Sequence, residues 1–260
     1  MLKNQSKKTR RQTKILDTLK LDPTKRVHEL ARDLEVSSET IRRDLAELDA
    51  EGSIRRTYGG AVRAGTYEPA LAERLKLFIR ERERIAKRTV ELLEGVENLY
   101  IGGGATTLHF ARTLRSVERH MTILTASFEI ALELAGNPLL DVISLPGNVE
   151  LQEGLVHGPE TLRFIEQYNV EATVIGASAA DEIGVSEALP SAADVYSAMI
   201  RQAERTFVVA DSSKIGKTSL KRVLKWDGDT VLVTDTAPPE DFTKAVSSLD
   251  VTIIVAASAN

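Results

Sequence analysis

Two adjacent pairs of arginines, Arg42 with Arg43 and Arg55 with Arg56, lie on either side of a single glycine, Gly52. A guanidinium group keeps its charge at physiological pH, and its planar fork of donors fits a phosphate group. Two such pairs on one surface could bind phosphates along a nucleic-acid duplex.

A second set of residues with binding chemistry begins in the segment IGGGATT, residues 101–107. Its glycines let backbone N–H groups converge, and a helix that starts directly afterwards adds the positive end of its dipole, so a phosphate could be cradled there. Four later segments, TASFE, LPGN, IGASAADE and ADSSKIGK, could complete such a site. The candidate ligand-binding residues are Gly103, Gly104, Ala105, Thr106, Thr107, Ser127, Gly147, Ser178, Asp211 and Lys214.

Several enzyme motifs are approached but not matched. The segment DSSKIGKT has Asp211 where a phosphate-binding P-loop needs glycine, and GGGATT has Thr107 in place of the last glycine of a dinucleotide fingerprint. No Ser/His/Asp order and no pair of carboxylates indicates a catalytic site. The four histidines are far apart and there are no cysteines, so we expect no catalytic residues, no cofactor and no metal.

The arginine pairs need elements that hold them, and the pattern around them predicts a helix-turn-helix. Apolar residues at helical spacing predict a first helix over residues 9–20, which ends before Pro23, and a second helix from Val27. The segment EVS, residues 35–37, is short enough to be the tight turn that follows.

The third helix is expected to begin after the N-cap Ser37 and to end near Gly52. Ile41, Leu45 and Leu48 fall on one narrow stripe, and Arg43 then points away from it, as in a recognition helix that enters the major groove. The segment SIRRTYGGAV, residues 53–62, predicts two short strands around a glycine turn, a wing. The candidate DNA-binding residues are Ser37, Ser38, Thr40, Arg42, Arg43, Arg55, Arg56 and Tyr58.

The rest of the chain alternates β-branched runs with helical patterns. The runs are NLYIG, MTILTA, DVISL, ATVIGA, TFVVAD, TVLVTD and VTIIVA. Their spacing predicts βαβ units and a mainly parallel sheet covered by helices, in which ligands bind at the carboxyl ends of the strands. The fold class is therefore α/β with a winged helix-turn-helix at the amino terminus. The expected domains are 1–65 for DNA, 66–95 as linker and connecting helix, and 96–260 for the ligand.

Charge supports this division. The 260 residues have a net charge of −4, but residues 1–65 carry 15 Lys and Arg against 10 Asp and Glu, whereas the remainder carries 19 against 28. A basic module on an acidic body suggests that the small part meets a polyanion. No apolar run is long enough to cross a bilayer and no secretory leader is evident, so we expect a cytoplasmic protein without a membrane partner.

The segment from Val36 to Ala61 resembles the signature of DeoR-type bacterial transcriptional regulators, which runs Val-Ser-x-x-Thr-Ile-Arg-Arg-Asp-Leu, then Leu-x-x-x-Gly, then Arg and Gly-Gly-Ala. The resemblance implies a winged helix that reads operator DNA, usually in a repressor of a sugar-catabolism operon. Such regulators end in a sensor domain related to ribose-phosphate isomerases, which binds a phosphorylated sugar without converting it. GGGATT looks like their Asp-x-Gly-Thr-Thr-Thr loop, TAS like Thr-Asn-Ser, and ADSSK like Asp-Ser-Ser-Lys.

Three positions depart from that pattern: Gly102 stands in place of Asp, Ala105 in place of Thr, and Ala126 in place of Asn. Side chains that would contact sugar hydroxyls are shortened or lost. We therefore expect an effector that is still phosphorylated but has an unusual organic portion, bulkier than a simple hexose phosphate.

The sequence thus predicts a homo-oligomeric repressor, dimer or tetramer, that binds double-stranded operator DNA and is released by a small phosphorylated sugar-like effector. Two alternatives remain. One is a sugar-phosphate isomerase-like enzyme with an incidental amino-terminal extension, and the other is an architectural DNA-binding protein with an inert body.

Overall fold

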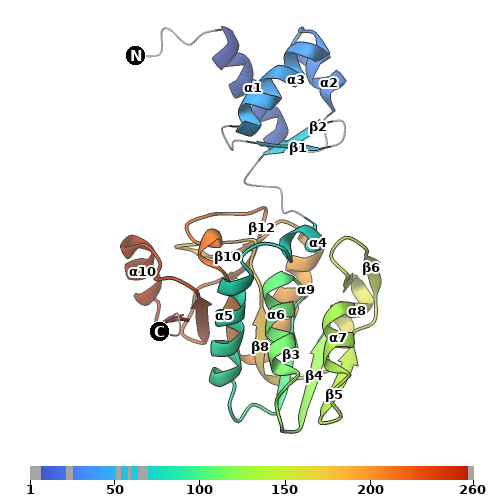
Figure 1. The fold of residues 1–260 in the computed structure, drawn as a ribbon, viewed down its shortest axis with the longest axis vertical. Helices are drawn as coiled ribbons and strands as arrows, with labels where there is room; N and C mark the ends of the chain where they lie inside the picture. The colour runs from blue at the N-terminus through green and yellow to red at the C-terminus, as the bar shows by residue number, and fades with distance from the viewer. Residues whose placement is uncertain (1–6, 22–25, 51–53, 58–59, 64–69, 257–260) are drawn as a thin grey trace. The chain divides into compact units, whose positions relative to one another are not determined.

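The chain divides into two compact units, Met1–Glu68 and Pro69–Asn260, each with a hydrophobic core of its own. The computed structural model (Figure 1) describes residues 7–21, 26–50, 54–57, 60–63 and 70–256. Among these residues, no helix combines the length and the apolar character needed to cross a membrane.

The first unit is a winged helix-turn-helix, as predicted. Its elements are α1 (Lys7–Leu21), α2 (Val27–Asp33), α3 (Ser38–Ala50) and an antiparallel hairpin of β1 (Ile54–Thr57) and β2 (Gly60–Arg63). The apolar positions at helical spacing form one small core, made of Ile15, Leu19, Leu30, Ala31, Ile41, Leu45 and Leu48. Burial of this stripe from all three helices fixes how α3 lies against the other two.

The turn between α2 and α3 is closed by backbone hydrogen bonds. The N–H of Val36 donates to the carbonyl of Ala31 at 3.0 Å, and Glu35 takes a left-handed conformation with φ of 53°. Ser37 then caps α3, because its hydroxyl accepts a hydrogen bond from the N–H of Thr40 at 3.1 Å. The short turn and the cap set the start of α3 at Ser38.

In the described part of the second unit, seven strands form a wholly parallel sheet, and each corresponds to one of the β-branched runs. In spatial order they are β14 (Thr252–Val255), β13 (Thr230–Thr234), β11 (Ala203–Val209), β8 (Val170–Ile175), β3 (Asn98–Ile101), β4 (Met121–Thr125) and β5 (Leu140–Ser144). The prediction of an α/β fold with a mainly parallel sheet is confirmed.

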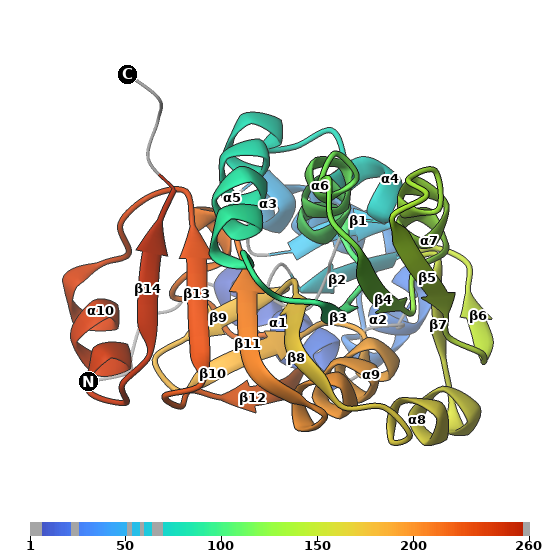
Figure 2. The ribbon, with the colours of Figure 1, turned by 90° about the horizontal axis from the view of Figure 1, so that it is seen from below.

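Helices cover both faces of this sheet (Figure 2). One face is covered by α5 (Ile79–Leu92), α6 (Ala105–Leu114) and α7 (Phe128–Leu134), and the other by α8 (Pro159–Ile165), α9 (Pro190–Arg201) and α10 (Glu240–Ser247). Strand residues alternate between the two layers: Leu99 and Ile101 pack with the first set, and Tyr100 packs with the second. Burial on both faces explains why the strands read as continuous apolar runs.

Smaller elements lie outside the main sheet. They are α4 (Leu71–Arg74), the hairpin of β6 (Asn148–Glu150) and β7 (Leu155–His157), the 3-10 turn η1 (Ser212–Lys214), and an antiparallel sheet of β9 (Ala179–Asp181), β10 (Gly184–Glu187) and β12 (Lys221–Lys225). In the latter sheet, the carboxylate of Asp181 accepts two hydrogen bonds from the guanidinium of Arg222, at 2.7 and 2.9 Å. This pair joins β9 to β12.

The order of the strands creates a switch point between β3 and β8. From β3 the chain continues to β4 and β5 on one side, whereas β8 lies on the other side and leads to β11, β13 and β14. The loops that follow β3 and β8 therefore leave in opposite directions, which is where parallel α/β sheets bind their ligands.

Candidate functional site

The predicted recognition helix has one buried and one exposed side. Ile41, Leu45 and Leu48 are buried in the core of the first unit. Arg42 and Arg43 are exposed, and Arg42 forms a long ion pair with Glu39, at 3.5 Å between Nη1 and Oε2. Both guanidinium groups are therefore available to a phosphate or a base edge.

The hydroxyl residues at the start of α3 have a structural use. The Ser37 hydroxyl lies 2.9 Å from the Thr40 hydroxyl and also caps the helix, while Ser38 is half-buried. These side chains define the end of the helix that carries Arg42 and Arg43.

An acidic residue of the same helix, Asp44, holds it against α1. Asp44 is buried, and its carboxylate accepts hydrogen bonds from Nε and Nη2 of Arg11, the latter at 2.9 Å. The hydrogen bonds that Arg11 donates to Asp44 raise the pKa of Arg11, so that guanidinium stays charged. This ion pair could not be predicted from the sequence pattern, because Asp44 is one of several charged residues on a polar helix.

The second arginine pair lies on the hairpin. Arg55 is opposite Val62 and Arg56 is opposite Ala61 in the register of β1 and β2. The side chains of the hairpin, and all of Tyr58, lie outside the described residues.

The glycine turn after β3 leads directly into α6, as expected. Gly104 occupies the N-cap position with φ of 118°, a value that side chains disfavour, and the Thr107 hydroxyl donates to its carbonyl at 3.0 Å. Ala105, Thr106 and Thr107 are buried, whereas Gly104 is partly exposed. The first N–H groups of a helix have no acceptor within it, so an anion at this turn would meet backbone donors rather than hydroxyls.

The two serines predicted for the site are each held by a glutamate. The Ser178 N–H and hydroxyl donate to the two carboxylate oxygens of Glu187, at 3.0 and 2.6 Å. The Ser127 hydroxyl caps α7 by accepting from the N–H of Ile130, and it lies 3.3 Å from the carboxylate of Glu129. Glu129 belongs to the segment TASFE, whereas Glu187 could not be assigned to this edge of the sheet from the sequence pattern.

The loop after β11 is held by two buried carboxylates. Asp211 accepts from the N–H and the hydroxyl of Ser213, and Asp235 accepts from the N–H of Ser212 at 2.6 Å. The other oxygen of Asp211 faces the buried guanidinium of Arg82, at 3.3 Å. Asp211 thus shapes the turn, and the half-buried Lys214 at its end is one lysine of this loop that can offer charge to a ligand.

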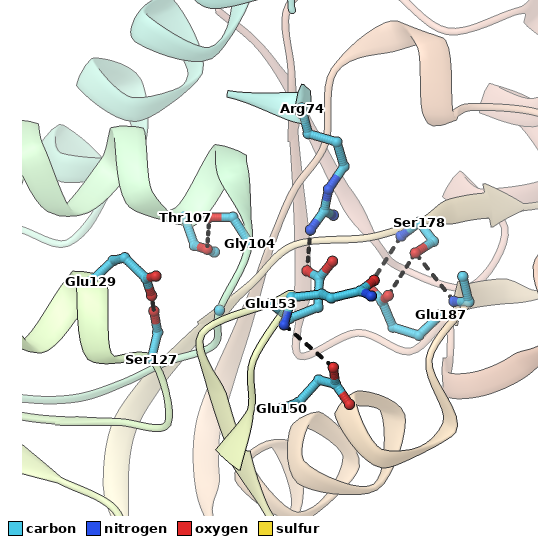
Figure 3. A network of polar contacts seen from close by, with 12 residues as sticks. Arg74, Gly104, Thr107, Ser127, Glu129, Glu150, Glu153, Ser178 and Glu187 are labelled. Atoms are coloured by element: carbon cyan, nitrogen blue, oxygen red, sulfur yellow. Dashed lines mark hydrogen bonds and ion pairs between the residues drawn. The ribbon is translucent and has the colours of Figure 1, made fainter. Parts of the chain in front are cut away.

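Arg74, at the end of α4, brings a further cation to this edge (Figure 3). Its guanidinium forms an ion pair with Glu153, in the loop between β6 and β7, and the two side chains are only 12% and 22% exposed. Its backbone carbonyl accepts a hydrogen bond from Arg82. Figure 3 shows the pair with the turn of Gly104 and Thr107 on one side and Ser178 with Glu187 on the other.

The departure at position 102 has a structural reason. A Cβ atom added to Gly102 would lie 2.9 Å from Cε1 of Tyr196, so the ring of Tyr196 occupies the room that a side chain at 102 would need. The expectation of a bulkier organic portion is therefore not supported at this position, because the shorter residue leaves no space for a ligand.

Gly147 lies apart from this group. A Cβ on it would meet the Thr161 hydroxyl and the His157 carbonyl, at 2.1 and 2.6 Å, so its neighbours are β7 and α8.

Metal ligation was not expected, and within the described ranges no group of three or more His, Asp or Glu side chains could hold a metal ion. Burial lowers the pKa of His109, the most enclosed histidine described, which keeps it neutral.

Comparison with known proteins gives matches along most of the chain. Residues 11–66 match the DeoR-like helix-turn-helix domain and residues 78–236 match the DeoR C terminal sensor domain.

Curated relatives align over nearly their full length. The transcriptional repressor AccR of Agrobacterium fabrum is 31% identical, over 86% of this chain and 88% of that protein. The HTH-type transcriptional repressor GlcR of Bacillus subtilis is 27% identical, over 93% of each. The lactose phosphotransferase system repressor of Lactococcus lactis is 26% identical, over 88% of this chain and 91% of that protein.

Among solved structures, ribose 5-phosphate isomerase A from Methanocaldococcus jannaschii is 17% identical and covers 53% of this chain and 55% of its own, with a TM-score of 0.40. A likeness at that level supports no conclusion about chemistry.

Proposed function

The chain belongs to the DeoR family of transcriptional regulators, and on that premise we propose that it represses a carbohydrate-catabolism operon and is released from operator DNA by a phosphorylated sugar or related metabolite. The names of its relatives support the first part, since they include a repressor of a lactose phosphotransferase system. The described geometry supports the second.

The observation that carries the proposal is the sidedness of α3. A helix whose apolar stripe is buried and whose adjacent arginines are exposed has little structural need for those arginines. Arginines on the outer face of a helix-turn-helix can donate hydrogen bonds to DNA phosphates and to the edges of guanine bases. We assign Arg42 and Arg43 to this contact, with Ser37, Ser38 and Thr40 at the end of the helix, and Arg55, Arg56 and Tyr58 on or beside the hairpin.

We assign the effector to the carboxyl ends of β3, β8 and β11. Its phosphate would lie at Gly104, where the N–H groups of α6 begin, with Arg74 and Lys214 as the nearby cations. Gly103, Ala105, Thr106 and Thr107 shape that turn, Ser127, Ser178 and Asp211 hold the surrounding loops, and Gly147 is left out.

Release from DNA requires that the effector prefer one arrangement of the protein over another. We propose that residues 1–65 bind DNA, that residues 66–95 connect the two parts and contribute Arg74 to the effector site, and that residues 96–260 supply the rest of that site. Operators are read as repeated half-sites, so a homo-oligomer would hold two DNA-binding modules together. The same proposal predicts no turnover of the effector and action inside the cell, where the DNA is.

Fluorescence anisotropy of a labelled duplex from upstream of the chain's own gene tests this function. The protein should bind that duplex more tightly than a scrambled one, and at least one phosphorylated sugar or polyol should release it. Consumption of a sugar phosphate by the protein, with no effect on bound DNA, would favour the isomerase-like alternative. Specific binding that no metabolite alters would favour the architectural one.

A further inference from the structure

Tyr196, on α9, packs against the glycine turn that follows β3. A Cβ on Gly102 would lie 2.9 Å from Cε1 and 3.2 Å from Cδ1 of the ring, distances closer than ordinary contact between carbon atoms. The Tyr196 hydroxyl donates to the carbonyl of Gly103 at 3.0 Å. The ring therefore fills the space beside Gly102 and also fixes the backbone of Gly103.

This contact is at the switch point of the sheet. The N–H of Gly102 donates to the carbonyl of Val174 on β8 at 2.9 Å, and a Cβ on Gly176 would lie 3.8 Å from the Gly103 carbonyl. Tyr196 thus closes the sheet side of the place where the loops after β3 and β8 separate, which is where a ligand of such a sheet binds.

A second apolar side chain closes the same turn. A Cβ on Gly103 would lie 3.1 Å from Cδ1 of Leu155, which is buried, and 3.5 Å from the Tyr196 hydroxyl. The place that a side chain at Gly103 would take is therefore occupied by an aliphatic group and by the Tyr196 hydroxyl. A ligand whose phosphate is at Gly104 and whose organic portion extends toward Gly102 would meet these two side chains.

Burial keeps the hydroxyl of Tyr196 neutral. Burial raises its pKa well above the ordinary value, Glu187 and Glu153 raise it further, and Arg74 opposes them. Tyr196 therefore presents a neutral ring beside Gly102, whereas an aspartate at 102 would present a carboxylate able to accept hydrogen bonds from sugar hydroxyls.

Resting on the effector site proposed above, we propose that Tyr196 is its specificity-determining residue and that it selects a short phosphorylated metabolite, of the glycerol phosphate or phosphoglycerate class, over a hexose phosphate. The ring takes the volume that a longer organic portion would need next to Gly102. The buried position of the ring in the core leaves it little freedom to move aside.

The test is release of operator DNA by glycerol phosphate, phosphoglycerate and glucose phosphate, measured with full-length protein. The wild type should need a concentration of glucose phosphate about tenfold or more above that of the better short phosphate, the scale on which a pocket separates ligands that differ by a few atoms. Tyr196→Leu, which removes the ring, should narrow this ratio to about twofold. Tyr196→Phe keeps the ring and should keep the ratio.

Melting curves show whether each variant is folded. If Tyr196→Leu is not folded, the comparison of wild type with Tyr196→Phe still tests the proposal. Equal response of the wild type to short and hexose phosphates overturns the proposal, and so does an unchanged ratio in folded Tyr196→Leu. A wild-type ratio that Tyr196→Phe abolishes also contradicts it, because the hydroxyl and not the ring would then select. If no phosphate releases DNA from any form, the effector class proposed above has failed and this inference fails with it.

Discussion

Arg74 and Glu153 form a largely enclosed ion pair between the end of α4 and the loop after β6. The two residues are 79 positions apart in sequence, and Arg74 is also held through its carbonyl by Arg82, whose guanidinium faces Asp211. One short helix is thus tied to two of the loops that surround the proposed effector site. An anionic effector would compete with Glu153 for the guanidinium of Arg74.

Replacement of Glu153 by Gln should make the protein more sensitive to its effector. The change removes the competing carboxylate and keeps the shape of the side chain. An ion pair of this exposure contributes about 1 kcal/mol, so the effector concentration for half release of DNA should fall about fivefold. The control is Glu160→Gln, which neutralises an exposed carboxylate on α8. Unchanged or reduced sensitivity of folded Glu153→Gln would show that effector and Glu153 do not compete.

Arg43→Ala should remove specific DNA binding. Loss of a guanidinium that contacts a base edge costs about 1–3 kcal/mol at the matched base pair, so the preference for operator over scrambled duplex should collapse. Arg56→Ala should instead weaken binding to both duplexes evenly and reduce the salt slope by about 1. Arg32→Ala on α2, which is also highly exposed, serves as the control. Full specificity in Arg43→Ala would contradict the assignment of α3.

Much of the fold could be predicted from the spacing of apolar residues in the sequence, because that spacing reflects which side chains are buried. The β-branched runs became the strands of the parallel sheet, and the stripe of Ile41, Leu45 and Leu48 became the buried face of α3. The loops of the proposed site could also be located, since parallel strands bring their carboxyl ends to one edge.

The contents of that edge could not be predicted in the same way. Tyr196 reaches Gly103 across 93 positions, and on α9 it reads as one more apolar residue at helical spacing. Glu153 lies in a short loop without periodicity. Such partners are set by how distant elements pack together, which no local spacing encodes.

Glu35→Gly should stabilise the first unit. Glu35 has φ of 53° in the turn before α3, a conformation that glycine adopts without the steric cost of a Cβ. Relief of this strain should raise the free energy of unfolding by about 0.5–1 kcal/mol, measured by urea denaturation. Glu35→Ala separates the effect of backbone strain from the effect of the charge, because it removes the carboxylate but keeps the Cβ. An equal gain from Glu35→Ala would mean that strain is not the cause.

Asp181→Asn should lower stability at neutral pH and flatten its acid dependence. Burial alone would raise the pKa of Asp181, but hydrogen bonds from Arg222 and Thr218 outweigh it and lower the pKa from 3.8 to about 2. A carboxyl whose pKa is lower in the folded protein stabilises fully above its unfolded value and loses that contribution as the pH falls from about 4 to about 2. With allowance for solvent screening, the loss at pH 7 is about 1–2 kcal/mol.

Denaturation at a series of pH values measures this effect. The control is Asp194→Asn, which removes an exposed ion pair with Lys221 and should change stability little. Parallel acid profiles for wild type and Asp181→Asn would contradict the assigned role of the Asp181 pair.

In the division proposed above, the first unit holds DNA and the second unit responds to a small phosphate. Its most direct test is the anisotropy of a labelled duplex from upstream of the chain's own gene, bound by the full chain and then titrated with phosphorylated metabolites. The full chain should bind this duplex tightly and a scrambled duplex weakly, and a short phosphate should then lower the anisotropy. Binding no tighter than to the scrambled duplex, or a complex that no phosphate dissociates, would contradict it.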